Sequence, residues 1–269
     1  MTGRTQVHER TSTAPPAVAA PSFAAAVAGV YAGQLARARA ARGPLLFVAV
    51  LQSLGIEILL RGVVRHDQPA TSSAIVAGST ILVSAFVGLN LLAQRFGALR
   101  ANGALDYYGA LPITGAAVVV GTAASYATFT IPGALITATV GTALFGLPFT
   151  YLWLAVPACV VAGLALSAVG AAIGLGLPRP ELATTVGQLA MTAVLFLSVI
   201  PPAHFPAGLR GVRDALPSTY PVDALAAALR GHPSASGQLW RLAVAMGYAL
   251  LALALAGRVF RRSVDRARG

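Results

Sequence analysis

Long uninterrupted apolar stretches, separated by short polar segments, dominate the pattern of hydrophobic and polar positions along the chain. Several of these stretches reach the roughly 20 residues that a helix needs to cross the hydrocarbon core of a bilayer. The pattern predicts six membrane-spanning helices, at about residues 44–60, 72–94, 113–144, 151–177, 182–200 and 239–256. Because the runs are continuous rather than alternating segments of about 10 residues, they disfavour an outer-membrane β-barrel.

Two of these runs carry local signals of their own. The third is too long for one straight span, and Pro132 lies within it, which predicts a kink or a break in the helix. In the fourth, Gly170 and Gly174 have the spacing of small residues that allow two membrane helices to approach closely.

The chain before the first span divides into two parts. Residues 1–21 are rich in Ala, Pro, Ser and Thr, and we expect a disordered tail because they offer little to bury. Residues 22–42 place apolar side chains such as Phe23 and Tyr31 at helical spacing and end in arginines. This pattern predicts an amphipathic helix lying in the membrane interface. A cleavable signal peptide is disfavoured, because the first long apolar run begins only after Arg42.

The loop before the last span, residues 201–236, is too polar to cross the membrane and too apolar to lie free in water. It predicts short helices that dip into the outer leaflet or rest on it. A plain extracellular loop is the alternative.

The segment between the second and third apolar runs is the most polar part of the centre of the chain. Arg95, Arg100 and Asp106 cannot be accommodated together in hydrocarbon, so this segment must leave the membrane. Tyr107 and Pro112 mark its return to the interface, where Tyr is enriched. The segment predicts either a short helix that contacts a soluble partner or an ordinary solvated connector. Asp106 could also cap a helix.

Composition supports a polytopic helical membrane protein. The chain is 57% hydrophobic and 10% charged, with a mean hydropathy of +0.75, whereas soluble domains contain about 25% charged residues. The net charge of +11 is carried by arginine without a single lysine, which excludes an ordinary Walker A motif in this chain. An ATPase that drives it would therefore be another polypeptide. Aromatic platforms among the basic residues are missing, so we expect no nucleic-acid partner.

The distribution of arginines predicts the orientation. With the N-terminus inside, 13 of the 19 basic residues fall on cytoplasmic segments, as the positive-inside rule requires. Both termini and the segment 95–113 are then cytoplasmic. The expected organisation is a tail at 1–21, an interfacial helix at 22–42, a six-helix membrane domain at 43–257 and a basic cytoplasmic tail at 258–269.

Glu57 is the one acidic residue well inside a predicted span, where ionisable groups are commonly functional. Arg61 follows at the spacing of a helical ion pair. This spacing predicts either a structural ion pair of Glu57 and Arg61 near the outer interface or residues that line a transport pathway. The single cysteine and the four scattered histidines lack metal-ligand spacing, so we expect no metal site and no cofactor bound by this chain.

Two sequence motifs resemble those of the permease subunits of type-2 ABC exporters. In the segment 100–112, RANGALDYYGALP, the matching positions are Arg100, Gly103, Leu105, Asp106 and Pro112. In the segment 217–225, PSTYPVDAL, they include Pro217, Thr219, Tyr220 and Asp223, and Pro206 resembles the proline after the fifth span. The sequence departs from the family pattern at Ala101, where a Glu is usual, and at Leu216, where an Asn is usual.

The resemblance implies half of a transporter. A second copy or a sibling permease would complete the pathway, and two ATP-binding subunits would carry the ATP and Mg²⁺ and dock on cytoplasmic helices. The residues implied for that contact are Arg95, Arg100, Gly103, Leu105, Asp106, Tyr107 and Pro112. The implied activity is export of a drug-like, lipid or glycolipid substrate across a bacterial plasma or inner membrane.

Three other classes compete with this interpretation. A membrane-embedded enzyme needs converging acid–base or metal groups, and no such cluster is evident. An ion-coupled transporter usually has several ionisable groups near the midplane, and these spans contain almost none. A structural membrane subunit without transport activity remains open.

Overall fold

A computed structural model describes residues 21–37, 42–200, 206–231 and 233–268, apart from 64–67. The described chain is all-helical. Its elements are α1 (Phe23–Arg37), α2 (Arg42–Val63), α3 (Pro69–Ala85), the π-helix η1 (Phe86–Leu91), α4 (Leu92–Ala101), α5 (Ala104–Ala110), α6 (Gly115–Phe145), the 3₁₀ turn η2 (Leu152–Leu154), α7 (Ala155–Gly176), α8 (Pro180–Val199), α9 (Ala207–Ala215), α10 (Thr219–Leu229) and α11 (Ala235–Arg268). The predicted disordered tail, the four histidines and the Pro201-Pro202 pair lie outside the described residues, apart from residue 21 of the tail.

Six segments of the described chain are long and apolar enough to cross a membrane, which confirms the six predicted spans. They cover 43–63, 69–101, 115–145, 152–176, 180–198 and 235–262. The second span extends seven residues past its predicted end, because α3, η1 and α4 run on without a break to Ala101. Arg95 and Arg100 therefore belong to the end of a long helix, not to a connector that follows it.

The break that Pro132 could introduce in the third span is not present. The helix α6 continues from Gly115 to Phe145 with this proline inside it. It packs against α1, α2, α3, α7 and α11, and such neighbours make prolines tolerable in membrane helices. One uninterrupted helix therefore forms the third span.

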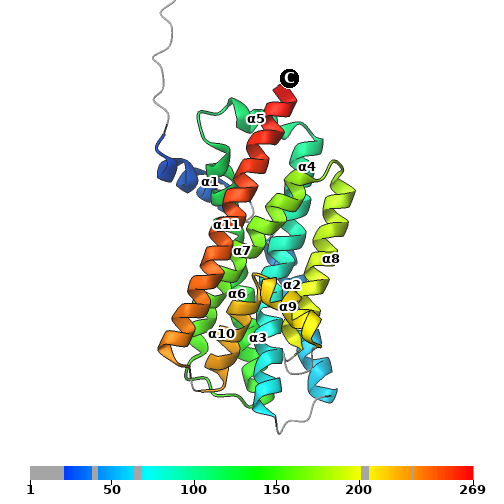
Figure 1. The fold of residues 1–269 in the computed structure, drawn as a ribbon, viewed down its shortest axis with the longest axis vertical. Coiled ribbons are helices and arrows are strands. Elements are labelled where there is room, and N and C mark those ends of the chain that lie inside the picture. The colour runs from blue at the N-terminus through cyan, green and yellow to red at the C-terminus, as the bar shows by residue number, and fades with distance from the viewer. Residues whose placement is uncertain (1–20, 38–41, 64–67, 201–205, 232, 269) are drawn as a thin grey trace, which may run out of the picture.

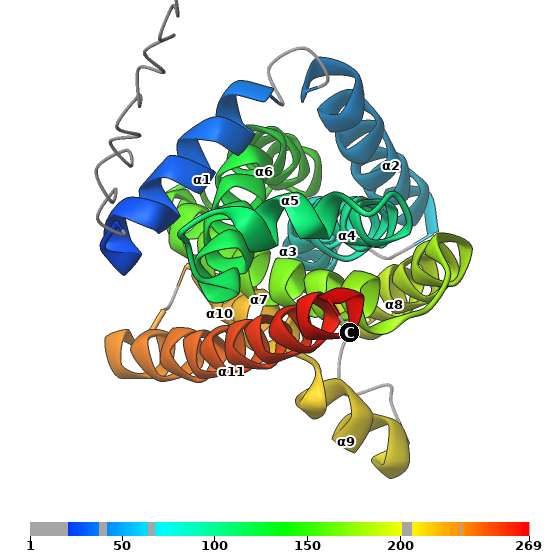
Figure 2. The same cartoon turned by 90° about the horizontal axis from the view of Figure 1, so that it is seen from above.

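The helices form an elongated bundle with α3 and α7 in the middle and α2, α8 and α11 at the periphery (Figures 1 and 2). In the most apolar window of each span, 89% of the second span is buried in the bundle but only 17% of the first. The first span, α2, is thus the one held least by its own chain.

Glycines on α7 allow it to press against the second span. A Cβ atom on Gly170 would lie 2.0 Å from the carbonyl oxygen of Gly88, and one on Gly174 would lie 2.5 Å from that of Ala93. The close packing predicted for the Gly170–Gly174 pair is confirmed. Small residues bring membrane helices together in this way because dispersion contacts, rather than a hydrophobic driving force, hold them in lipid.

Short helices cover the two ends of the bundle. The helices α1 and α5 and the C-terminal end of α11 lie at one end, and α9 and α10 lie toward the other (Figure 1). The helix α1 packs along α6. Its predicted place at the membrane interface stays a prediction.

Candidate functional site

The α4–α5 corner, which we define as residues 95–112, contains the first motif. The chain leaves α4 at Ala101 and turns through Gly103, whose φ of 66° is left-handed. L-residues with a side chain seldom adopt this conformation, so the turn favours glycine. The turn starts α5, the seven-residue helix at the tip of the corner.

Arg100 fastens the corner to the fourth span. Its guanidinium Nη1 donates to the carbonyl oxygens of Leu175 at 2.7 Å and Leu177 at 3.1 Å. These carbonyls lie at the C-terminal end of α7, where helix carbonyls lack partners and the helix dipole is negative. The Arg100 guanidinium donates hydrogen bonds to these carbonyls, and its positive charge is attracted by the negative end of the dipole. Arg100 therefore links the second span to the fourth.

Leu105 fastens the corner to the last span. Its side chain is buried in an apolar cluster with Phe96 of α4, Leu175 of α7 and Phe260 of α11. The helix α5 also contacts α4, α6 and α11 directly. The corner is therefore built into the bundle and does not hang from it as a free loop.

The outward side of the corner carries an aromatic pair. The rings of Tyr107 and Tyr108 meet edge to face, with centroids 5.8 Å apart. Tyr108 is half-buried, whereas Tyr107 is 68% exposed, and Pro112 is exposed just beyond α5. Arg95 is half-buried on α4, and Asp106 is the third residue of α5, with a side chain outside the description.

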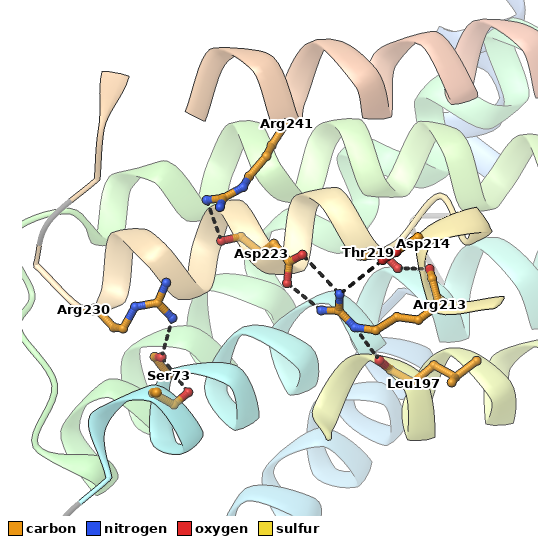
Figure 3. Close-up of polar contacts among 9 residues, drawn as sticks. Ser73, Leu197, Arg213, Asp214, Thr219, Asp223, Arg230 and Arg241 are labelled. Atoms are coloured by element: carbon orange, nitrogen blue, oxygen red, sulfur yellow. Dashed lines mark hydrogen bonds and ion pairs between the residues drawn. The ribbon is translucent and has the colours of Figure 1, made fainter. Parts of the chain in front are cut away.

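The second motif lies at the other end of the bundle, where Arg213 of α9 meets Asp223 of α10 (Figure 3). The guanidinium makes two hydrogen bonds to the carboxylate, of 2.5 and 3.2 Å. Its Nε donates to the carbonyl oxygen of Leu197 in α8 at 3.2 Å. We call Arg213, Asp223 and the carbonyl of Leu197 the outer clamp. They join α8, α9 and α10 at the end of the bundle away from the α4–α5 corner.

Other residues of the motif surround the outer clamp. Thr219 donates its hydroxyl to the carbonyl of Arg213, and Arg241 of α11 reaches the carbonyl of Asp223 at 3.4 Å (Figure 3). Pro206 precedes the first turn of α9, and Pro217 is half-buried in the turn before α10. The sequence singled out Asp223 as a motif position, and the structure shows that its partner is Arg213.

Tyr220 connects the same region to the last span. Its ring stacks on Tyr248 of α11, with centroids 5.8 Å apart and planes 27° apart. Burial, then the neighbouring Tyr248, Asp214 and Asp223, raise the pKa of Tyr220, so its phenol is neutral at physiological pH.

The helix α10 is packed inside the protein. Most of its residues, including Val222, Leu225 and Leu229, are buried against neighbours such as α3, α7 and α11. Its far end is joined to α3, because Arg230 donates to the hydroxyl of Ser73 at 3.4 Å. The alternative of a plain extracellular loop is therefore wrong for this part of the segment.

The predicted ion pair between Glu57 and Arg61 does not form. The Glu57 side chain is fully buried, and neither carboxylate oxygen has a hydrogen-bond partner among the described residues. Arg61 is exposed. The helix turns Glu57 toward α6, where its carboxylate lies against Gly141, so spacing along α2 did not decide its neighbour.

Apolar hollows open at the side of the bundle. One of about 320 Å³ lies between α2 and α8 and is lined by Ile56, Leu59, Leu60, Leu195, Phe196 and Ile200. Another, of about 540 Å³, lies among α7, α8 and α11.

In the described residues, no three His, Cys, Asp or Glu side chains gather as a metal site would require.

Six spans with a braced helical corner at one end and a packed helix pair at the other define a multi-pass membrane subunit. The chain belongs to the ABC-2 type transporter family, whose model matches residues 33–229. This match runs from α1 to the end of α10 and includes both motifs. The protein is thus a permease subunit of a transporter and is not itself an enzyme. No individually curated protein matches the chain.

Proposed function

We propose that this permease works as the membrane half of an ATP-driven exporter, with ATP and Mg²⁺ bound by a separate subunit. Family members typically act with ATP-binding subunits, and the absence of lysine leaves this chain without a Walker A motif. Two ATP-binding subunits and a second permease, either another copy or a sibling, complete the proposed transporter.

The observation that carries this proposal is the bracing of the α4–α5 corner. The corner continues the second span and holds the fourth through Arg100. It holds the sixth through the packing of α5 against α11, where Leu105 and Phe260 belong to one buried apolar cluster. A force applied to α5 is therefore passed to three spans at once. Its exposed Tyr107 supplies an aromatic group of the kind enriched where proteins meet.

The charge distribution supports a cytoplasmic position for this end. Arg37 of α1, the corner itself, Arg179 before α8 and the arginines at the end of α11 all belong to it. Under the positive-inside rule, both termini lie in the cytoplasm of a bacterium with this protein in its plasma or inner membrane. The outer clamp then faces the opposite side.

The apolar hollow between α2 and α8 supports an amphipathic cargo. Its six lining residues are all aliphatic or aromatic, which suits the hydrocarbon part of a drug-like molecule, a lipid or a glycolipid. Exposed apolar side chains on the same two helices but outside the hollow, such as Leu51 and Leu189, are suited to contact lipid or a second permease.

Purification of the tagged protein from its native membrane in mild detergent tests the proposal. We expect a stoichiometric partner with a Walker A motif, and we expect Tyr107→Ala to weaken its retention because this side chain faces outward. Trp240→Ala is the matched control, since Trp240 is equally exposed at 68% but lies at the other end. If native-level expression gives the chain alone and no ATP-binding protein crosslinks to it, the proposal fails.

A further inference from the structure

Glu57 lies in a notch that fits its carboxyl group closely. It faces α6 at Gly141, where a Cβ atom would lie 2.5 Å from the Glu57 Oε1 and 2.8 Å from its Cδ. The missing side chain at position 141 is what makes room for the carboxyl. The contact is tight, and the Glu57 side chain is 0% exposed.

Hydroxyl residues lie near Glu57 and Gly141 along the two helices, and they are uncharged. Ser53 lies one turn before Glu57 on the same face of α2, and Thr137 and Thr142 lie beside Gly141 on α6. All three are buried, and the hydroxyls of Ser53 and Thr142 have no hydrogen-bond partner among the described residues. Such groups can hydrogen-bond to a neutral carboxyl but cannot balance a charge.

The helices around the notch bring no cation to it. The helix α3 has no charged or titratable side chain. On α6 the one titratable group is Tyr126, which is 15 residues before Gly141, or about 22 Å along the axis. On α2 itself, Arg61 is exposed and Arg42 begins the helix at its other end. An ionised Glu57 would therefore be a buried charge without compensation, which proteins avoid.

We propose that Glu57 is a proton-binding site that senses whether α2 is packed against α6. While the two helices are in contact, the carboxyl holds a proton. When α2 moves away and water reaches the notch, the carboxyl O–H bond breaks, the proton passes to water and the carboxylate stays on Glu57. Because the first span is the least enclosed by its own chain, it is the span best placed to move in this way.

This inference deepens the permease function by assigning a proton to one of its conformational steps, and it rests on the α2–α6 contact alone. It predicts that alkaline pH favours separation of the two helices, since loss of protons stabilises the state in which Glu57 is exposed. No ATP-binding subunit is needed to test it, so its failure and that of the exporter proposal are distinguishable.

Infrared spectroscopy of the full chain in lipid nanodiscs tests the bound proton directly. We expect the C=O stretch of a protonated carboxylic acid at neutral pH, absent in Glu57→Gln and retained in Glu181→Gln. Glu181 is the matched control because it lies exposed in the first turn of α8. A band that persists in Glu57→Gln, or no band in the wild type, would overturn the proposal.

The wild-type protein provides a test that does not depend on folding of a variant. Its three glutamates are Glu9, Glu57 and Glu181, so ¹³C labelling of glutamate must shift the band if Glu57 carries the proton. A band unaffected by this labelling overturns the assignment. A band that disappears when sodium replaces choline in the buffer would instead make the notch a cation site, which also overturns it.

Distance measurements between spin labels test the movement. Labels at the exposed positions Leu59 on α2 and Ile136 on α6, in a Cys159→Ala background, report the separation of the two helices. We expect longer distances at alkaline pH in the protein with Glu57 and no such response in Glu57→Gln. An equal response in both proteins would contradict a proton-sensing role for Glu57.

Discussion

Arg213 and Asp223 form a two-point ion pair between α9 and α10, with the arginine side chain only 5% exposed. Planar guanidinium and carboxylate groups match in this geometry, which makes the pair directional as well as charged. The same arginine also donates to the carbonyl of Leu197 in α8. The outer clamp thus sets how three helices meet at this end of the bundle.

Removal of Asp223 should destabilise the outer clamp more than removal of both partners. We expect Asp223→Ala to cost about 2–3 kcal/mol, less than a fully buried pair because a third of the Asp223 side chain is exposed. The variant leaves the buried Arg213 charge unpaired, whereas the double variant with Arg213→Met does not. Thermal unfolding of the four members of this cycle in nanodiscs measures the coupling.

The control for this prediction is Asp214→Asn. Asp214 lies 3.8 Å from Arg213 but is 65% exposed, so we expect a change within about 0.5 kcal/mol. Equal losses from Asp214→Asn and Asp223→Ala would show that net charge, rather than the clamp geometry, governs stability here.

Replacement of Arg100 should loosen the α4–α5 corner. Arg100→Ala removes two hydrogen bonds to the end of α7, and hydrogen bonds to charged groups contribute about 1.5–3 kcal/mol. We expect faster hydrogen exchange in α5 and at the end of α7, measured by mass spectrometry. Arg179→Ala, an exposed arginine at the same end, should leave exchange in both segments unchanged.

Gly103→Ala should strain the turn into α5. The left-handed φ of Gly103 makes a side chain unfavourable there by about 1–2 kcal/mol. Gly176→Ala is a suitable comparison, because a Cβ on Gly176 meets nothing within 4 Å and its φ is ordinary. Thermal unfolding should separate the two variants, and similar midpoints would mean that the turn can relax.

Gly170→Ala should disrupt the contact between α7 and the second span. A Cβ atom 2.0 Å from the backbone oxygen of Gly88 cannot be accommodated without moving a helix, and overpacking of this kind costs about 1–3 kcal/mol or more. We expect a lower yield of monodisperse protein in size-exclusion chromatography. Gly247→Ala, at an open position within α11, should behave as the wild type.

The sequence predicted the spans well because apolar length alone decides whether a helix can cross a bilayer. It placed the end of the second span too early, because Arg95 and Arg100 were expected to leave the membrane as soon as they occurred. The hydrogen-bond partners of Arg100, the carbonyls of Leu175 and Leu177, lie about 75 residues further along the chain. Contacts between residues so far apart in the sequence cannot be predicted from the hydropathy of a local segment.

The partners of the two acidic residues Glu57 and Asp223 could not be read from the sequence for a related reason. Spacing along α2 put Glu57 and Arg61 on one face, but tertiary packing buried Glu57 against α6 and left Arg61 outside. For Asp223, the motif indicated an important acid, while only the folded arrangement of α9 and α10 selected Arg213 as its partner. Local periodicity therefore located these groups along the chain but did not identify their neighbours.

The uninterrupted second span has a consequence for steric access. Its 33 residues extend about 50 Å at 1.5 Å per residue, whereas a bilayer with its headgroups is about 40–45 Å thick. Standing upright from the opposite face, the helix would raise about one or two of its last turns clear of the lipid headgroups. A large soluble protein could then reach Tyr107, on α5 just beyond this helix, from the water.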